Sequence, residues 1–472
     1  MDDKTPDKKG AGEVRSRLRY VVSARLSDGS LAETVYRPDE KRTVFCFLQD
    51  DKPRYEERIT DGTQVLVPYS GRNNLIRHNV VRLPSRAEAY ESEAALMAEI
   101  RSFIHRFVDV SPLFEAIASY YVLLSWVYDD FNELPYLRVI GEPGSGKTRF
   151  LLTVGSLCYK PIFASGASSV SPIFRILDAF SGTLVIDEGD FRASDERAEI
   201  VKILNNGHAR GFPVLRSELS PTGEYNPRAY RVFGPKLVAT RSFFQDRALE
   251  SRCLTEEMGQ RGMRDDVPIN LPPSHEIQAL RLRNQLLTFR FRNSGKRRLA
   301  ENLVDRTIEP RLNQVFVPLL SLVRDDGLRR ELQELAQRYH RDQIAERGMD
   351  PEAQILEIIR DIRAQNGPLA IKDIADWFAD RHGDEYERKV TAKWIGWVIR
   401  KRLRLQTQKR HGVFVVADGS LPKLERLFER YGIGRDEATP EPSEVSPPEG
   451  LPQVDNGDVG DGARVVGSES LG

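Results

Sequence analysis

The feature that most constrains the fold is a glycine-rich segment, Gly141-Glu142-Pro143-Gly144-Ser145-Gly146-Lys147-Thr148, which follows a short, mostly apolar run at 136–140. The run is typical of a strand, and the residues after the segment have the apolar spacing of a helix. This spacing, G-x-x-x-x-G-K-[ST] between a strand and a helix, is that of a phosphate-binding loop. Glycine lets successive N–H groups turn toward phosphate oxygens at the helix N-terminus. The sequence therefore predicts a nucleotide site in an α/β fold.

The cofactors expected at this site are ATP and Mg²⁺. Residues expected to bind the nucleotide are Gly141, Gly144, Ser145, Gly146, Lys147 and Thr148. Lys147 supplies a charge to the β and γ phosphates, and the Thr148 hydroxyl is a ligand for Mg²⁺. A second apolar run, 183–187, ends in Asp187 and is followed by Glu188. We expect Asp187 to hold Mg²⁺ and Glu188 to activate the attacking water, since two acids at a strand end suit phosphoryl transfer.

Strand-like and helical patterns alternate from about 135 to 260, which is typical of a parallel sheet with crossover helices. The predicted strands cover 136–140, 161–165, 183–187, 236–240 and 253–258. Around this core the patterning predicts five further segments. They are a small antiparallel β domain at 14–84, a helical connector at 85–134, a helical lid at 261–365, a helix–helix–hairpin unit at 366–418 and a disordered acidic tail at 436–472.

Charge and cysteine content narrow the class of protein. The formal net charge is zero, but 436–472 holds nine acidic residues against the single Arg464, so the remaining chain is basic. The three cysteines, Cys46, Cys158 and Cys253, are far apart and form no CxxC motif, which favours a reducing, cytoplasmic setting. The most apolar stretch, 116–128, is too short to cross a bilayer and predicts a buried helix. We therefore expect no membrane partner.

The combination of motifs resembles the AAA+ ATPases. In that family a polar residue at the end of a further strand positions the water near the γ phosphate, and Thr240 occupies this place. The segment Leu249-Glu250-Ser251-Arg252 resembles the L-x-S-R segment of minichromosome-maintenance-like helicases. The resemblance implies that Arg252, or alternatively Arg247, reaches a neighbouring subunit's nucleotide as an arginine finger. Arg311, at the start of a lid helix, resembles a second γ-phosphate contact; the alternative for each arginine is an ordinary surface ion pair.

The region 202–233 resembles the part of superfamily 3 and primase-associated helicases in which a hairpin enters the pore of the ring. It predicts a helix end at Asn205-Asn206-Gly207 and two β-like arms around 220–223. Arg210 and Arg216, with Arg228 and Arg231 as further candidates, would then contact a DNA backbone. A charged surface hairpin is an equally good interpretation.

The helix–helix–hairpin unit matches the winged-helix arrangement. From Arg388 to Arg410 it has nine lysines or arginines and no acidic residue, which is an electrostatic footprint for phosphates. The candidate DNA contacts are Lys393, Arg400 and Lys401 on the second helix and Lys409 and Arg410 on the wing. The alternative is a basic module that only contacts protein. Trp394 and Trp397 are expected in the core.

The function that the residues and the resemblance together indicate is an oligomeric, Mg²⁺-dependent ATPase that moves on or remodels DNA. A ring, most simply a hexamer, is implied because the finger arginine acts on a neighbour. The alternative is an ATP-gated DNA-binding regulator or defence switch that does not unwind DNA, and a third interpretation is a purely structural protein. The N-terminal portion has no acidic or metal-ligand cluster of the primase kind, so primer synthesis is not predicted.

Overall fold

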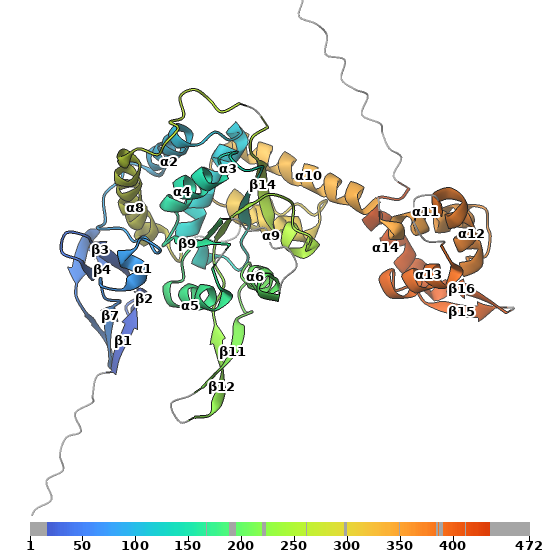
Figure 1. Cartoon of the computed structure of the whole chain (residues 1–472), viewed down its shortest axis with the longest axis horizontal. Helices are drawn as coiled ribbons and strands as arrows, with labels where there is room; N and C mark the ends of the chain where they lie inside the picture. Colours follow the sequence, from blue (N-terminus) through green and yellow to red (C-terminus); the bar gives the residue numbers. More distant parts are fainter. Residues whose placement is uncertain are drawn as a thin grey trace, which may run out of the picture. The chain divides into compact units, whose positions relative to one another are not determined.

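The computed structural model describes residues 17–166, 168–187, 195–219, 223–260, 262–296, 300–348, 350–383, 386, 390–410 and 412–434. The predicted acidic tail at 436–472 lies outside the described residues. The chain divides into two compact units, 1–343 and 344–472, which we describe separately (Figure 1).

The first unit begins with a β module of two small sheets. Its strands are β1 (Arg17–Val21), β2 (Ser23–Arg25), β3 (Leu31–Arg37), β4 (Arg42–Gln49), β5 (Lys52–Glu56), β6 (Ile59–Asp61) and β7 (Gln64–Pro68). β2-β3-β4-β5 form an antiparallel sheet, as predicted. The second sheet, β1-β7-β6, departs from the prediction because β1 pairs with β7 in parallel. The first and last strands of the module therefore lie side by side and run in the same direction.

A five-stranded sheet forms the centre of this unit. Its strands are β8 (Tyr136–Ile140), β9 (Ile162–Ser165), β10 (Leu184–Asp187), β13 (Lys236–Thr240) and β14 (Cys253–Glu257). Every neighbouring pair is parallel, and the order is β14-β8-β13-β10-β9. The prediction of an α/β fold with these five strands is thus confirmed. Because β8 lies between β13 and β14, the carboxyl ends of three strands meet at one place on the sheet edge.

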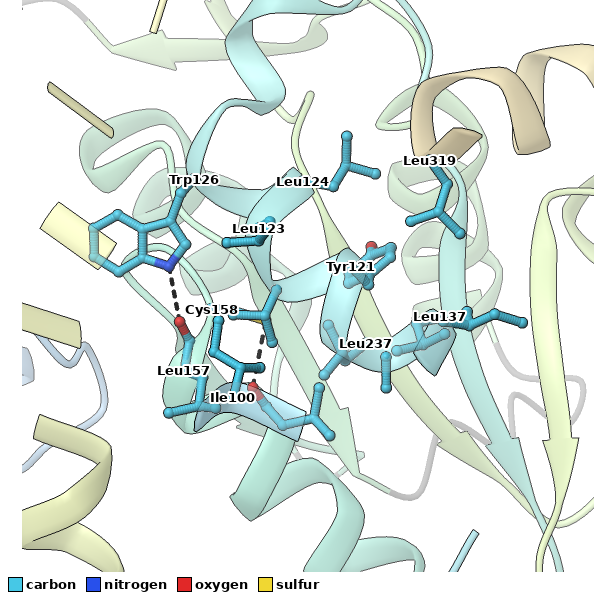
Figure 2. Packing of buried hydrophobic residues seen from close by; sticks show 14 of the residues in the cluster. Ile100, Tyr121, Leu123, Leu124, Trp126, Leu137, Leu157, Cys158, Leu237 and Leu319 are labelled. Carbon is cyan, nitrogen blue, oxygen red and sulfur yellow. Dashed lines mark hydrogen bonds between the residues drawn. The ribbon is translucent and has the colours of Figure 1, made fainter. Parts of the chain in front are cut away.

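Helices cover both faces of the central sheet. The described helices of the unit are α1 (Asn74–Arg77), α2 (Glu93–Phe107), α3 (Pro112–Trp126), α4 (Lys147–Leu157), α5 (Val170–Phe180), α6 (Asp195–Asn206), α7 (Arg247–Glu250), α8 (Pro273–Asn293), α9 (Pro310–Leu320) and α10 (Asp326–Gly348), whose residues up to 343 belong to this unit. On one face α2, α3, α4, α8 and α9 share a core with Leu137 and Leu237 of the sheet, and Tyr121 of α3 lies at its centre (Figure 2). On the other face α5 and α6 pack against Leu184 and Val238. The buried helix predicted at 116–128 is α3.

A hairpin projects from the core between α6 and β13 (Figure 1). Its strands, β11 (Val214–Leu219) and β12 (Tyr225–Tyr230), pair antiparallel with Arg216 opposite Arg228. The two predicted β-like arms are therefore present, while residues 220–222 lie outside the described residues.

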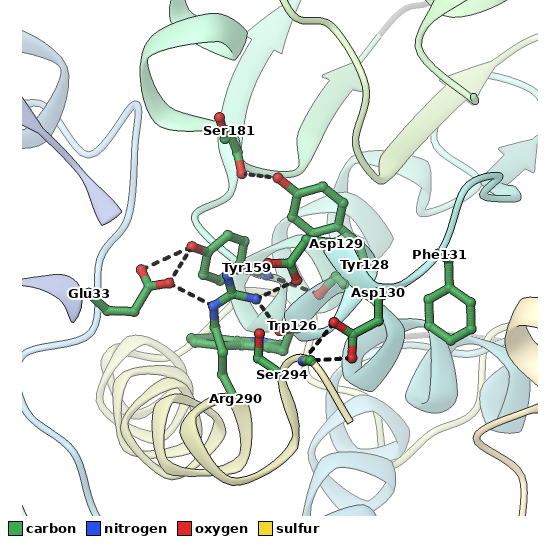
Figure 3. A network of polar contacts seen from close by, with 12 residues as sticks. Glu33, Trp126, Tyr128, Asp129, Asp130, Phe131, Tyr159, Ser181, Arg290 and Ser294 are labelled. Atoms are coloured by element: carbon green, nitrogen blue, oxygen red, sulfur yellow. Dashed lines mark hydrogen bonds and ion pairs between the residues drawn. The ribbon is translucent and has the colours of Figure 1, made fainter. Parts of the chain in front are cut away.

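A buried ion-pair network ties the β module to the central sheet and to α8 (Figure 3). The Glu33 carboxylate of β3 accepts from Arg290 Nε of α8 at 2.7 Å and lies 2.8 Å from Lys160 Nζ. Arg290 also donates to both Asp129 oxygens at 2.9 Å, and the Tyr159 hydroxyl donates to Glu33. The Glu33, Lys160 and Arg290 side chains are at most 3% exposed. Two carboxylates balance two cations, which is the condition under which buried charges are tolerated.

The second unit is a small helical core with a hairpin. Its elements are α11 (Pro351–Ala364), α12 (Ile371–His382), α13 (Ala392–Trp397), a π-helical turn at Val398–Arg402, β15 (Thr407–Arg410), β16 (Val413–Val416) and α14 (Leu421–Tyr431). Ile359, Phe378 and Ile399 meet in one apolar cluster. β15 pairs antiparallel with β16 and includes Lys409 and Arg410, so both residues lie on this hairpin. Among the described helices of the chain, none has the length and apolar character that a bilayer crossing requires.

Candidate nucleotide-binding site

The glycine-rich segment connects β8 to α4 at the carboxyl edge of the sheet. Gly144 and Gly146 have φ angles of 85° and 95°, a region that side chains with a Cβ atom rarely adopt. A Cβ atom on Gly141 would lie 2.6 Å from the carbonyl oxygen of Met258, so this position also requires glycine. The backbone therefore needs glycine at the positions that the motif prescribes, and the loop ends on the N-terminus of α4.

Two polar side chains of the site meet directly. The Thr148 hydroxyl, in the first turn of α4, donates to Asp187 Oδ2 at the end of β10 over 2.6 Å. Beside them, Lys147 Nζ donates to the carbonyl oxygens of Gly141 and Glu142 at 2.6 and 2.8 Å. Hydroxyl and carboxylate oxygens are ligands that suit Mg²⁺, and an ammonium group suits phosphate oxygens. Glu188, the predicted base, lies outside the described residues.

The loop opens into a cavity of about 1060 Å³. Its polar wall includes Ser145, Lys147, Thr148 and Asp187. Two segments that the sequence did not connect with the site, 108–111 and 256–269, supply much of the rest. Their lining residues include the apolar Val108, Val110, Met258, Met263, Val267 and Ile269 and the acidic Asp109, Glu256 and Glu257. A cavity with a phosphate-binding loop in its wall and apolar side chains among its lining can hold a phosphate chain and a base.

Thr240 lies beside the phosphate loop, as its position at the end of β13 implied. Its carbonyl oxygen accepts from Gly141 N at 3.3 Å, and its buried hydroxyl has no hydrogen-bond partner among the described residues. The next residue, Arg241, lines the cavity. Sequence reasoning missed Arg241, although its place directly after the strand end is the signal that could have found it.

The three arginines that were predicted to contact nucleotide phosphates, Arg252, Arg247 and Arg311, do not line this cavity. Arg252 precedes β14 and so lies at the amino edge of the sheet, away from the phosphate loop. It is 7% exposed and donates to Asn205 Oδ1. Burial and the positive charge of nearby Arg311 lower the pKa of Arg252. Arg247, in contrast, is exposed in α7, whose first turn is capped by the Asp246 side chain.

A histidine, His208, lies near Arg252 and Arg311. His208 Nδ1 lies 2.9 Å from the carbonyl oxygen of Asn205. Burial, with the charges of Arg252 and Arg311, lowers the pKa of His208 to about 4. The histidine is therefore neutral at pH 7.

The hairpin arginines are engaged within the chain. Arg210 donates to the carbonyl oxygen of Phe131, and ion pairs join Arg216 to Glu199 at 3.0 Å and Arg228 to Glu218 at 3.4 Å. Arg231 pairs with Asp178 at 3.3 Å. What the hairpin region instead exposes, and what sequence reasoning missed, is a set of large apolar side chains. These are Phe212, Leu215, Leu219 and Tyr225, all at least 60% exposed.

In the second unit the basic candidates lie on the surface. Lys393, Arg400, Lys401 and Lys409 are exposed, and the exposed Arg410 pairs with Asp418 at 2.6 Å. Trp394 packs against Phe378 and Tyr386, as expected of a core residue. The same expectation is wrong for Trp397, which is 49% exposed at the end of α13. α13 thus presents an aromatic ring next to cations.

Comparisons with known proteins give distant structural likenesses. No protein-family model matches the chain, and no curated protein matches it in sequence. Among solved structures, the C-terminal region of NrS-1 is 10% identical over 82% of this chain and 96% of its own, with a TM-score of 0.37. The helicase Cch of SCCmec type IV is 10% identical over 86% of this chain and 80% of its own, also with a TM-score of 0.37. An MCM homologue from Methanopyrus kandleri is 10% identical over 58% of this chain and 61% of its own, with a TM-score of 0.29.

Proposed function

We propose that the chain is a Mg²⁺-dependent ATPase that works as an oligomeric DNA motor. The observation that carries the ATPase proposal is the hydrogen bond between Thr148 and Asp187, formed beside Lys147 at the N-terminus of α4. The motif supplies a hydroxyl and Lys147, and the end of β10 supplies the carboxylate, so the two parts of a nucleotide–metal site meet where phosphates would bind.

The residues fit ATP and Mg²⁺ by the chemistry of their donors. Thr148 and Asp187 would hold Mg²⁺, which neutralises charge on the β and γ phosphates when bound. Lys147 would exchange its bonds to the loop carbonyls for phosphate oxygens, and the backbone N–H groups of Gly144 to Thr148 would orient the phosphate chain. Thr240, with a hydroxyl that has no partner among the described residues, would orient the attacking water, and Glu188 would accept its proton.

Oligomerisation is proposed because the candidate finger arginines lie at the other edge of the sheet. Arg247 is exposed there, while Arg252 is buried and bound to Asn205. Arg247, being exposed, could therefore face a second molecule, and Arg252 and Arg311 add further positive charge to this part of the unit. An arginine delivered in this way stabilises charge in the transition state only when subunits touch. A closed ring, most simply a hexamer, satisfies every subunit equally.

DNA is the proposed substrate of the motor. The exposed basic residues of α13, the π-helical turn and the β15–β16 hairpin suit a winged helix that contacts phosphates. The β11–β12 hairpin would contact the strand through Arg216 and Arg228 and through its exposed Leu215 and Tyr225, provided that the ion pairs open.

Two measurements test this proposal. Light scattering of the Glu188→Gln variant, which traps bound ATP, should give the mass of a ring, and a strictly monomeric protein would contradict the trans mechanism. Strand displacement on a forked duplex should require ATP and be lost in Lys147→Ala. If ATP drives assembly on DNA without strand displacement, the chain is an ATP-gated DNA-binding regulator instead.

A further inference from the structure

The β module contains a second cavity, of about 880 Å³, far along the chain from the phosphate loop. It lies between the β3–β4 turn, the exposed end of β1 and the segment from β7 to α1. The side chains that matter for its chemistry are Tyr20, Tyr36, Lys41, Arg58, Arg72 and Arg77, which we call the tyrosine–arginine pocket. Neither the motifs nor the proposed ATPase mechanism uses any of these residues.

The pocket holds a surplus of positive charge. Five cationic side chains line it against two acidic ones, Glu40 and Glu57. Both acids bind the same partner, Arg42, whose Nη1 donates to Glu57 at 2.7 Å. Among the described residues, no carboxylate pairs with Lys41, Arg58, Arg72 or Arg77, all of which are exposed. Cations collected around a cavity without counter-charges attract an anion, and arginine favours phosphate in particular.

A close backbone contact brings two of the segments that carry these cations together. A Cβ atom on Gly71 would lie 2.5 Å from the carbonyl oxygen of Lys41, so only glycine allows the two segments to touch. Lys41 itself has a φ angle of 50°, in the left-handed region, at the β3–β4 turn. This contact places Arg72 beside Lys41, although the two are far apart in sequence. The backbone positions of Lys41 and Arg72 are therefore held close together by this contact.

An aromatic ring lies at the border of the pocket. Tyr20 is 60% exposed on β1, the outer strand of its sheet, and Leu18, two residues earlier on the same face, is also 60% exposed. Unpaired bases stack on exposed aromatic rings, while neighbouring arginines contact the phosphates between them. In a duplex the base faces are hidden, so a ring of this kind gains nothing from double-stranded DNA.

We propose that the tyrosine–arginine pocket binds a single DNA strand, with phosphates on Arg72 and Arg77 and one base stacked on Tyr20. The inference rests on the proposed function, since it assigns the β module the role of holding the strand on which the motor acts. It gives the module a ligand and adds a DNA contact separate from the β11–β12 hairpin and the second unit.

The first test measures binding of a fluorescent 20-nucleotide oligo(dT) by anisotropy in the absence of ATP, over a series of salt concentrations. Arg72→Gln/Arg77→Gln should weaken binding about tenfold and make the salt dependence shallower by about 1.4 in log–log slope, because each phosphate contact contributes about 0.7. Tyr20→Ala should weaken it at least fivefold through lost stacking. The matched control is Lys52→Gln/Arg54→Gln on β5, two exposed cations outside the pocket, and it should stay within twofold of the wild type.

The second test locates the strand on the unmodified protein. An oligo(dT) that carries 4-thiothymidine should cross-link on irradiation to the peptide that contains Tyr20. A duplex of the same length and free thymidine monophosphate should not compete at equal nucleotide concentration. An RNA strand that competes more strongly than oligo(dT) would overturn the assignment to DNA.

The outcomes separate this inference from the proposed function. If wild-type ATP hydrolysis is stimulated by single-stranded DNA but the pocket variants bind like the control and no cross-link reaches the β module, the pocket inference alone is wrong. If the cross-link forms but DNA does not stimulate hydrolysis, the pocket inference stands and the motor proposal fails. If the wild type binds no single-stranded DNA, both are overturned.

Discussion

Arg138, in the middle of the strand that leads into the phosphate loop, forms a two-point ion pair with Glu250 of α7. Arg138 is fully buried, although most residues of a strand covered on both faces are apolar. Its guanidinium also lies under the rings of Phe243 and Phe244, and Phe244 N donates to Glu250 at 2.9 Å. One buried cation therefore holds the segment after Thr240 and the helix that bears Arg247 against the phosphate-loop strand.

Loss of Glu250 should be costly because it leaves this buried guanidinium without a counter-charge. We expect Glu250→Ala to lower the free energy of unfolding by roughly 3 kcal/mol, whereas Arg138→Met/Glu250→Ala should be less destabilised than the single variant. Urea denaturation measures both. Glu301→Gln, at an exposed position, is the control and should stay within about 0.5 kcal/mol of the wild type. Equal losses in the single and double variants would contradict this account of the pair.

The network around Glu33 predicts a pH-dependent stability. Burial alone would raise the pKa of Glu33, but the charges of Lys160 and Arg290 outweigh it and hold the pKa below its ordinary value of 4.5. The ionised carboxylate therefore stabilises the fold above pH 4.5, and this contribution is lost as the pH falls further. Glu33→Gln should cost about 3–5 kcal/mol at pH 7.5 and less at pH 3.5. The fluorescence of the buried Trp126, whose carbonyl oxygen also accepts from Arg290, reports the unfolding of this unit. A pH-independent difference would count against the network.

His208 predicts a loss of stability that begins at a higher pH than the loss expected from Glu33. Its folded pKa of about 4 lies below the ordinary value of 6.5, so the neutral ring contributes fully above pH 6.5 and loses its contribution as the pH falls toward 4. The stability of the wild type relative to His208→Gln should therefore decrease between pH 7.5 and 4.5. The unfolding midpoints of the two proteins at these pH values give the comparison. An advantage of the wild type that grows in acid would show that the histidine is not held neutral.

The strands and the phosphate loop were predictable because their signals are local. The run 136–140 and the glycines that follow it determine β8 and the loop without help from distant residues. The parallel pairing of β1 with β7 and the burial of Glu33 are not local, since each depends on where a segment far along the chain lies. Trp397 illustrates the same limit: its neighbours Ile395 and Val398 are buried, yet the ring lies on the exposed side of α13.

The cavity walls were missed for a related reason. Segments 108–111 and 256–269 carry no motif, and only the packing of α2, α3 and β14 brings them to the phosphate loop. Arg252 and Arg311 were assigned to phosphate contacts one by one, but the structure gathers them with His208 at the other sheet edge.

Arg247 and Arg252 should behave differently when each is replaced by alanine. Arg247→Ala removes an exposed side chain, so stability should change by less than about 0.5 kcal/mol, while ATP hydrolysis should fall by about 10³-fold. Arg252→Ala should also lower stability, by about 1–3 kcal/mol, because it empties a buried position and removes the hydrogen bond to half-buried Asn205.

Mixing experiments separate a trans role from a structural one. Lys147→Ala subunits lack a working phosphate loop but carry an intact Arg247, and Arg247→Ala subunits have the reverse defect. A mixture of these two inactive proteins should regain part of the hydrolysis rate, because some interfaces combine the two intact parts. No recovery, with mixed oligomers shown to form, would remove Arg247 from the trans site.

The central claim is that the phosphate-loop cavity hydrolyses ATP in response to DNA. Steady-state hydrolysis with Mg²⁺ should be measured for the wild type, Lys147→Ala and Asp187→Asn, each with and without single-stranded DNA. We predict that DNA raises the wild-type rate several-fold and that both variants lose at least a hundredfold of it. A wild type that binds ATP but turns it over negligibly, with or without DNA, would contradict the motor and leave a nucleotide switch.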